Sequence, residues 1–151
     1  TSGLLLFAKH RQAEIAMGKI FQTRKIKKHY VALVQGKIAD SGCVEVPLIT
    51  DWPNRPKQKV DFEQGKQSQT SWSVMKRESD RTWLELRPTT GRSHQLRIHL
   101  RELGHPILGD DLYAPPELQS RTDRLMLHAI SLTVVHPVSG ETLMLNSPCP
   151  F

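Results

Sequence analysis

The order of hydrophobic and polar residues in the first third of the chain predicts two strands and one helix. Residues 3–9 (GLLLFAK) form a short, nearly continuous apolar run, which predicts a central strand buried on both faces. Residues 11–21 carry apolar side chains at helical spacing with charged residues between them, which predicts an amphipathic helix. Residues 29–34 (HYVALV) follow a basic cluster and predict a second strand.

The remainder of the chain is richer in strand patterns. A short strand is expected at residues 44–49, whereas residues 51–59 (DWPNRPKQK) are expected to form a basic loop because two prolines interrupt any regular ladder. Residues 70–75 and 82–87 alternate polar with bulky side chains around a turn, which predicts an antiparallel hairpin. Strands thus dominate the middle of the chain.

A second helix and a last hairpin complete the pattern. Residues 92–103 predict a helix that ends before Gly104, and residues 130–135 and 141–145 predict two strands joined by HPVSG. Strands outnumber helices and their order is mixed. We therefore expect one α+β domain over residues 1–151, built around a mixed, largely antiparallel sheet with flanking helices.

The net charge of the chain indicates which class of partner it binds. The 151 residues contain 21 Lys and Arg against 15 Asp and Glu, a formal charge of +6, which favours a polyanion such as nucleic acid. A solvated basic surface is the alternative. Two cysteines without a C-x-x-C pair argue against a disulfide scaffold and fit a reducing, cytoplasmic setting. The longest apolar run is too short to span a membrane, so no membrane association is expected.

Several catalytic motifs are absent from the sequence. It has no phosphate-binding G-x-x-x-x-G-K-[ST] loop, no G-x-G-x-x-G, no H-E-x-x-H and no G-x-S-x-G. His94, His99 and His105 lack cysteine or carboxylate partners at the usual ligand spacing, so no metal site is expected.

The densest group of polar residues is G-R-S-H-Q-L-R-I-H-L at residues 91–100, followed by G-H-P-I-L-G-D at residues 104–110. Together these segments resemble the signature of the RluA family of pseudouridine synthases. T-S-G at residues 1–3 is similar to the second half of the family's H-R-L-D-x-x-T-S-G motif, and K-H-Y-V-A at residues 28–32 is similar to its K-x-Y-x-A motif. The resemblance runs in the right order along the whole chain.

This resemblance implies a pseudouridine synthase fold and an RNA isomerase that converts uridine from an N-glycosidic to a C-glycosidic nucleoside. It implies no metal, nucleotide or redox cofactor. A monomer is expected for the intact enzyme, because nothing in the sequence demands a larger assembly. Residues 51–59 and the C-terminal end look most like the branch that acts on both ribosomal RNA and tRNA anticodon stem-loops.

The resemblance also implies where the nucleophile lies. In the family it is the aspartate of H-R-L-D, and aligning T-S-G places it three residues ahead of Thr1. No aspartate within the sequence stands in the matching context. The domain is therefore expected to be N-terminally incomplete, and the chain as given to be inactive.

Two residues can be given supporting roles by the same motifs. Arg97 matches the arginine that pairs with the catalytic carboxylate, and Tyr30 matches the tyrosine that packs on the target base and takes part in proton transfer. The alternatives are an ordinary helix-surface arginine and an ordinary strand tyrosine. His94 and Gln95 are expected to support the pocket through hydrogen bonds.

RNA contacts are expected from the basic segments, because a uridine must be extruded from its stack before it can react. Phosphate contacts would offset part of that cost. The candidates are Arg24, Lys25, Lys27, Lys28, Arg55, Lys57, Lys59 and Arg92, with Trp52 stacking on a base. Each cation has the alternative of a solvated charge, and Trp52 that of packing its loop against the core.

Two other functions compete with the isomerase. A non-catalytic RNA-binding or RNA-chaperone module would use the same basic surface, and the absence of the aspartate from the parent chain would favour it. A DNA-binding protein fits the charge, but the sequence shows no helix-turn-helix or zinc-finger pattern.

Overall fold

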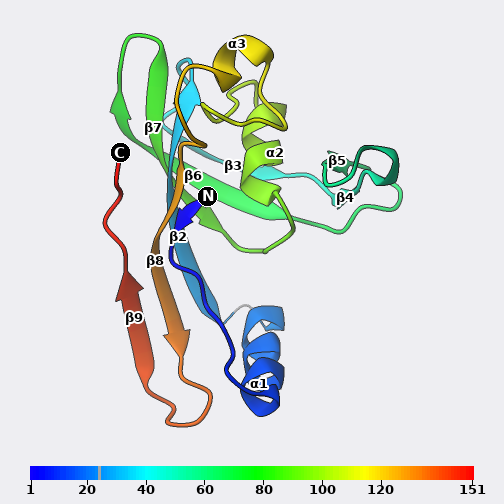
Figure 1. The fold of residues 1–151 in the computed structure, drawn as a ribbon, viewed down its shortest axis with the longest axis vertical. Coiled ribbons are helices and arrows are strands. Elements are labelled where there is room, and N and C mark those ends of the chain that lie inside the picture. The colour runs from blue at the N-terminus through cyan, green and yellow to red at the C-terminus, as the bar shows by residue number, and fades with distance from the viewer. Residues whose placement is uncertain (24) are drawn as a thin grey trace.

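One large sheet, to which both ends of the chain contribute, organises the protein (Figure 1). The computed structural model describes residues 1–23 and 25–151. The strand order is β1-β8-β2-β7-β6-β3, and β9 pairs with β8. The β1–β8 pair is parallel, and the other pairs of this sheet are antiparallel. The predicted α+β class with a mixed, largely antiparallel sheet is therefore confirmed.

The elements have the following bounds. The strands of the large sheet are β1 (Ser2–Gly3), β2 (Ile26–Gln35), β3 (Ser41–Glu45), β6 (Gln69–Arg77), β7 (Arg81–Pro88), β8 (Leu127–Val135) and β9 (Thr142–Asn146). The helices are α1 (Arg11–Gln22), α2 (Gln95–Glu102) and α3 (Pro116–Gln119). A separate hairpin, which we call the arm, comprises β4 (Leu48–Thr50), a 3-10 turn (Trp52–Asn54) and β5 (Gln58–Val60).

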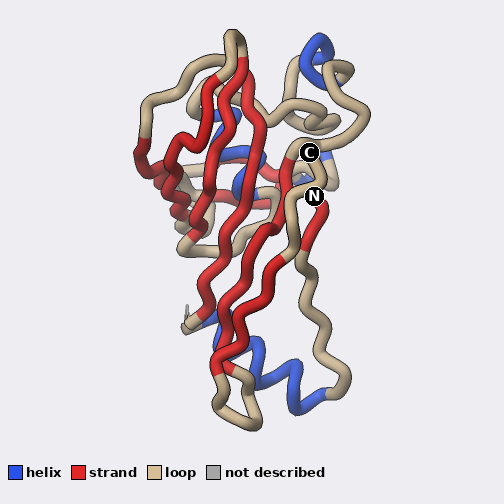
Figure 2. Tube along the Cα trace, turned by 90° about the vertical axis from the view of Figure 1, so that its left-hand side faces the viewer, coloured by secondary structure: helices blue, strands red, loops and turns tan. Residues whose placement is uncertain are grey.

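The helices cover one face of the sheet. In Figure 2 the long strands face the viewer, and the helices lie behind them. Leu84 and Leu86 of β7 are fully buried in the main core, where Leu100 of α2 packs with them. Near α1, Ile26 and Val134 form a smaller cluster, and the apolar side of α1 packs against it. No helix among the described residues is long and apolar enough to cross a membrane.

The predicted central strand at residues 3–9 is wrong. β1 ends at Gly3 and lies on the outer edge of β8, and Leu5 and Phe7 are 76% and 79% exposed. β8 already pairs with β2 along its other edge, and β9 occupies the outer edge from Ser131 onward. The chain after Gly3 therefore has no free edge along which to continue as a strand.

The other expected elements form with shifted boundaries. The expected strand at residues 44–49 is divided between β3 and β4, and part of the expected loop at residues 51–59 belongs to β5. α2 begins at Gln95 rather than at Arg92, because His94 adopts a left-handed conformation with φ of 54°. Gly104 has φ of 79° and ends the helix as predicted. α3 was not predicted.

Candidate active site

A cavity of about 460 Å³ opens where β1, β2, the turn after β7 and the start of α2 meet. Residues 1–5 form one side of it, and Leu127 and Ala129 of β8 contribute to its wall. Six residues singled out from the sequence line the same cavity: Lys28, Tyr30, Arg92, His94, Gln95 and Arg97. The fold thus brings the N-terminal motif, the tyrosine motif and the arginine motif together.

The charged side chains that line this cavity are all basic. Its lining includes the cations Lys28, Arg92 and Arg97, whereas no carboxylate side chain of the described residues lines it. Lys28 is partly buried, and its Nζ donates to the backbone carbonyl of Thr90 at 3.0 Å. Burial lowers the pKa of Lys28. A cavity of this kind suits an anionic or oxygen-rich ligand.

Tyr30 enters the cavity from an irregular point of β2. The pairing of β2 with β8 shifts register between His29 and Tyr30, and such bulges re-aim a side chain. The ring packs against the main core. Burial raises the pKa of Tyr30, so its hydroxyl stays protonated at neutral pH. Among the described residues no hydrogen bond involves that hydroxyl, and no fully buried polar side-chain atom lacks a partner, so the hydroxyl is open to the cavity.

Arg97 is held by two aspartates. Its Nε donates to Asp110 Oδ2 at 2.9 Å and its Nη2 to Asp110 Oδ1, while Nη2 also donates to Asp111 Oδ1 at 2.9 Å. The Asp110 side chain is 1% exposed and that of Arg97 12%. Burial alone would lower the pKa of Arg97, but the bonds and charge of Asp110 and Asp111 outweigh it and raise the pKa. Arg97 is therefore a fixed cation rather than a loose surface arginine.

Gln95 anchors the turn that precedes α2. Its Oε1 accepts from the Thr90 hydroxyl at 2.7 Å and from the Arg92 N–H at 2.9 Å. Its Nε2 donates to the Gln69 carbonyl at 2.9 Å and to Thr70 Oγ1 at 3.0 Å. The residue is 4% exposed. The Oε1 bonds hold the turn before α2, and the Nε2 bonds join α2 to β6, so the Gln95 side chain supports the cavity wall rather than reacting.

His94 stands at the N-cap of α2, but its ring makes no capping hydrogen bond. Instead Nδ1 lies 2.7 Å from the hydroxyl of Tyr113. Burial, and then the charge of Arg97, lower the pKa of His94, so the ring is neutral at pH 7. The other two histidines considered for a metal have different partners: His99 contacts Ser68 and Thr70, and His105 contacts the Gln35 carbonyl.

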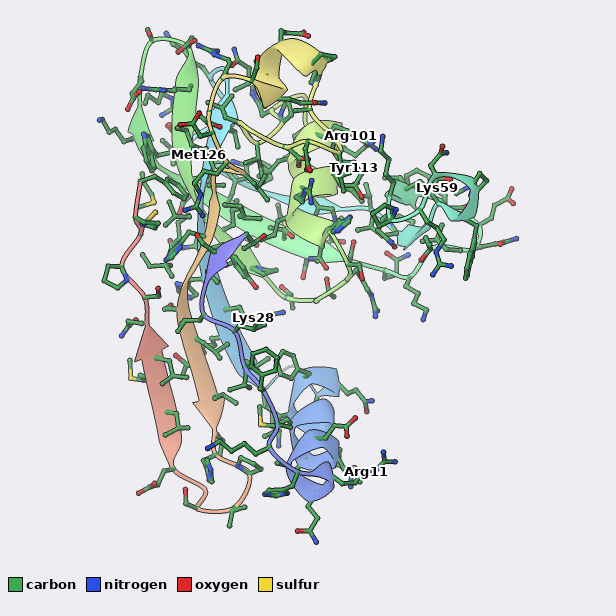
Figure 3. All side chains as sticks on the ribbon, in the orientation of Figure 1. Arg11, Lys28, Lys59, Arg101, Tyr113 and Met126 are labelled. Atoms are coloured by element: carbon green, nitrogen blue, oxygen red, sulfur yellow. The ribbon has the colours of Figure 1, made fainter. Side chains whose placement is uncertain are left out.

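The other RNA-contact candidates lie outside the cavity. Lys25 and Lys27 are exposed at the start of β2, whereas Arg55, Lys57 and Lys59 are exposed on the arm. Figure 3 shows Lys59 far from Lys28. Arg24 lies outside the described residues.

Trp52 does not pack its loop against the core. It is 66% exposed, and the Arg55 guanidinium lies 4.3 Å from its ring centroid.

Sequence reasoning missed Asp110 and Tyr113 as parts of the site. Asp110 belongs to the segment interpreted as a structural turn, and it does accept from the backbone N–H groups of Leu112 and Tyr113 at 3.0 Å. Its second role is to bind Arg97. That role could not be predicted from the sequence, because the two side chains meet only once the loop between them has folded. Tyr113, one of two tyrosines in the chain, offered no local signal.

Comparison with known proteins identifies the family. Residues 1–102 match the sequence model described as RNA pseudouridylate synthase. The chain belongs to the RNA pseudouridylate synthase family. The family predicted from the motifs is thereby confirmed. The chain is 54% identical to "Dual-specificity RNA pseudouridine synthase RluA" of Vibrio cholerae serotype O1 over 152 residues, which cover all of this chain and 62% of that protein.

Other pseudouridine synthases agree in sequence and fold. The protein of the same name in Escherichia coli strain K12 is 48% identical over 153 residues, covering all of this chain and 70% of that protein. The structure of human RNA Pseudouridylate Synthase Domain Containing 1 superimposes with a TM-score of 0.80 at 29% identity, over 95% of this chain and 63% of that one. The chain thus spans a little under two thirds of the Vibrio cholerae relative.

Proposed function

We propose that this protein isomerises uridine to pseudouridine in structured RNA, with ribosomal RNA and the tRNA anticodon stem-loop as substrates. The observation that carries the proposal is the cavity itself: Tyr30 and Arg97 line one cationic cavity together with the T-S-G segment. The dual-specificity names of the Vibrio cholerae and Escherichia coli relatives support the two substrate classes.

The reaction breaks the bond between ribose and a ring nitrogen of uracil and forms a bond to a ring carbon. A proton must leave that carbon, and one must reach the freed nitrogen. The unpartnered Tyr30 hydroxyl lines the cavity and is suited to exchange a proton, and its ring offers a face to the base. The cations Lys28 and Arg92 would hold the backbone of the extruded nucleotide.

We propose that Arg97 orients a carboxylate of the complete active site. Its Nε and Nη2 bind the two aspartates, whereas Nη1 makes no hydrogen bond within residues 1–23 and 25–151. A second carboxylate bound at Nη1 would be kept ionised by the guanidinium. We propose that this carboxylate is the family's aspartate, supplied from ahead of Thr1, which lines the same cavity.

The test compares three forms of the protein on a transcript of the anticodon stem-loop and on ribosomal RNA. One is the chain as given, the second carries H-R-L-D and two further residues ahead of Thr1, and the third has asparagine in place of that aspartate. Pseudouridine is measured by chemical labelling and primer extension. We expect product only from the second form. RNA binding without product in all three forms would instead support an RNA-binding or RNA-chaperone module.

We also propose that the protein acts as a monomer in the cytoplasm and needs no cofactor. Cys43 and Cys149 are both free thiols, which fits a reducing compartment. Sedimentation equilibrium with and without RNA tests the monomer, and fractionation of cells that express a tagged chain tests the compartment. A stable dimer or a secreted protein would contradict this proposal.

A further inference from the structure

One buried hydroxyl joins the arm to the cavity. Tyr113, in the loop between α2 and α3, is 6% exposed. Its hydroxyl oxygen lies 2.8 Å from the backbone nitrogen of Gln58 and 2.7 Å from Nδ1 of His94. Gln58 begins β5 of the arm, and His94 lines the cavity. In Figure 3 Tyr113 lies beside Arg101, on the side of α2 that faces the arm.

The two hydrogen bonds of the Tyr113 hydroxyl favour one tautomer of His94. A backbone N–H can only donate, so the Tyr113 hydroxyl accepts from Gln58. Among the described residues, the one other polar atom within hydrogen-bond distance of the hydroxyl is His94 Nδ1. The phenolic proton is buried with Tyr113, so Nδ1 as its acceptor is the arrangement that leaves no buried donor unsatisfied. A neutral imidazole with an unprotonated Nδ1 carries its hydrogen on Nε2. The remaining polar group of the His94 ring is therefore Nε2–H, which can donate a hydrogen bond.

The surroundings of Tyr113 hold this arrangement rigidly. The rings of Tyr113 and His94 meet edge to face, with centroids 5.5 Å apart and planes at 76°. The guanidinium groups of Arg97 and Arg101 lie 5.1 and 5.5 Å from the Tyr113 ring centroid. His94 keeps a left-handed backbone with φ of 54°, which non-glycine residues rarely adopt. The local backbone is strained in the conformation that brings the His94 ring to Tyr113.

We propose that Tyr113 is a positioning residue for RNA binding: it fixes His94 with an Nε2–H that donates to a carbonyl or phosphate oxygen of RNA in the cavity. The same hydroxyl also binds the backbone of the arm, so the arm and the His94 donor keep a fixed position relative to each other. The inference rests on the proposed function only in that RNA is the occupant of the cavity.

The test begins with Tyr113→Phe, which keeps the ring and its packing and removes the hydroxyl. Long-range proton–nitrogen NMR of the histidine rings should show the Nε2–H tautomer of His94 in the unchanged protein and a mixture in the variant. The Kd for an anticodon stem-loop RNA should rise about three- to tenfold, the size of one neutral hydrogen bond. Gln58→Ala keeps the backbone N–H, so the His94 tautomer should not change in this control.

A double-mutant cycle separates positioning from a merely structural role. If Tyr113 acts through His94, Tyr113→Phe should change the Kd less than twofold in a His94→Ala background. Tyr113→Leu, which also removes the ring, should lower the melting temperature more than Tyr113→Phe does. Additive losses of affinity, an Nδ1–H tautomer in the unchanged protein, or affinity that follows melting temperature across the variants would overturn the inference.

The NMR measurement needs neither RNA nor turnover, which keeps this inference apart from the proposed function. A protein that makes no pseudouridine, yet shows the Tyr113-dependent tautomer and a non-additive cycle, would contradict the proposed function and support the inference. Normal turnover with additive losses would do the reverse.

Discussion

The cavity and the arm both present residues expected to contact RNA, but they relate to the fold in opposite ways. In the cavity Gln95 is 4% exposed and the Arg97 side chain 12%, and both are held by several hydrogen bonds. On the arm Trp52 is 66% exposed, and β4 pairs with β5 in a sheet of its own. Gln95 and Arg97 are thus also part of the folded core, whereas Arg55, Lys57 and Lys59 of the arm are exposed. Substitutions at Gln95 and Arg97 should therefore lower stability, whereas substitutions on the arm should lower the affinity for RNA.

The largest effect is expected at Arg97. Arg97→Ala would leave the buried Asp110 carboxylate without its bidentate partner, which costs about 3–5 kcal/mol of unfolding free energy. Turnover in the form with the added aspartate should be lost as well. Urea unfolding checks the first result and pseudouridine formation the second. Arg97→Ala combined with Asp110→Asn is the control, which should recover stability but not turnover; normal turnover in either variant would contradict the assigned role.

Acid should weaken the junction between α2 and β6. Burial lowers the pKa of His99 to about 4 from an ordinary 6.5, and His99 lies between Ser68 and Thr70. The unfolded chain therefore binds a proton at a higher pH than the folded one. Stability should fall as pH drops from about 6.5 to about 4, by about 3 kcal/mol in total, and then level off for this group. Urea unfolding across pH measures it, and His99→Gln should flatten that window.

Gln95→Ala should destabilise the protein by about 2 kcal/mol, because it leaves buried groups of β6 and of the turn before α2 unsatisfied. Gln95→Glu keeps the shape but removes the two Nε2 donors, and it should be at least as destabilising. Thermal melts compare the two. A variant of unchanged stability would show that the cavity wall does not depend on Gln95.

The arm should give the smallest effect on stability and a clear one on affinity. Replacing Arg55, Lys57 and Lys59 together with alanine should change the unfolding free energy by less than about 0.5 kcal/mol. The slope of log Kobs for RNA against log salt concentration should fall in magnitude by up to about three. Replacing Arg11, Lys19 and Lys37 removes the same charge elsewhere and is the control. Equal slopes for both triple variants would place the RNA surface away from the arm.

Much of this protein is determined by local sequence. Periodicity predicted α1, α2 and the two long hairpins because the spacing of apolar residues records which face of an element is buried. Gly104 marked the end of α2 because a left-handed residue costs glycine least. The motifs around Tyr30 and Arg97 predicted the family, and the sequence match to that family confirmed it.

Only the tertiary structure decided the remainder, because contacts between distant segments leave no periodic trace in the sequence. The apolar run after Gly3 has the composition of a buried strand, but β9 occupies the edge of β8 that it would need. Asp110 and Tyr113 sit in a loop without a repeating pattern, and folding places one against Arg97 and the other between His94 and the arm. Local pattern thus determined the elements, and competition for sheet edges and buried hydrogen bonds determined the site.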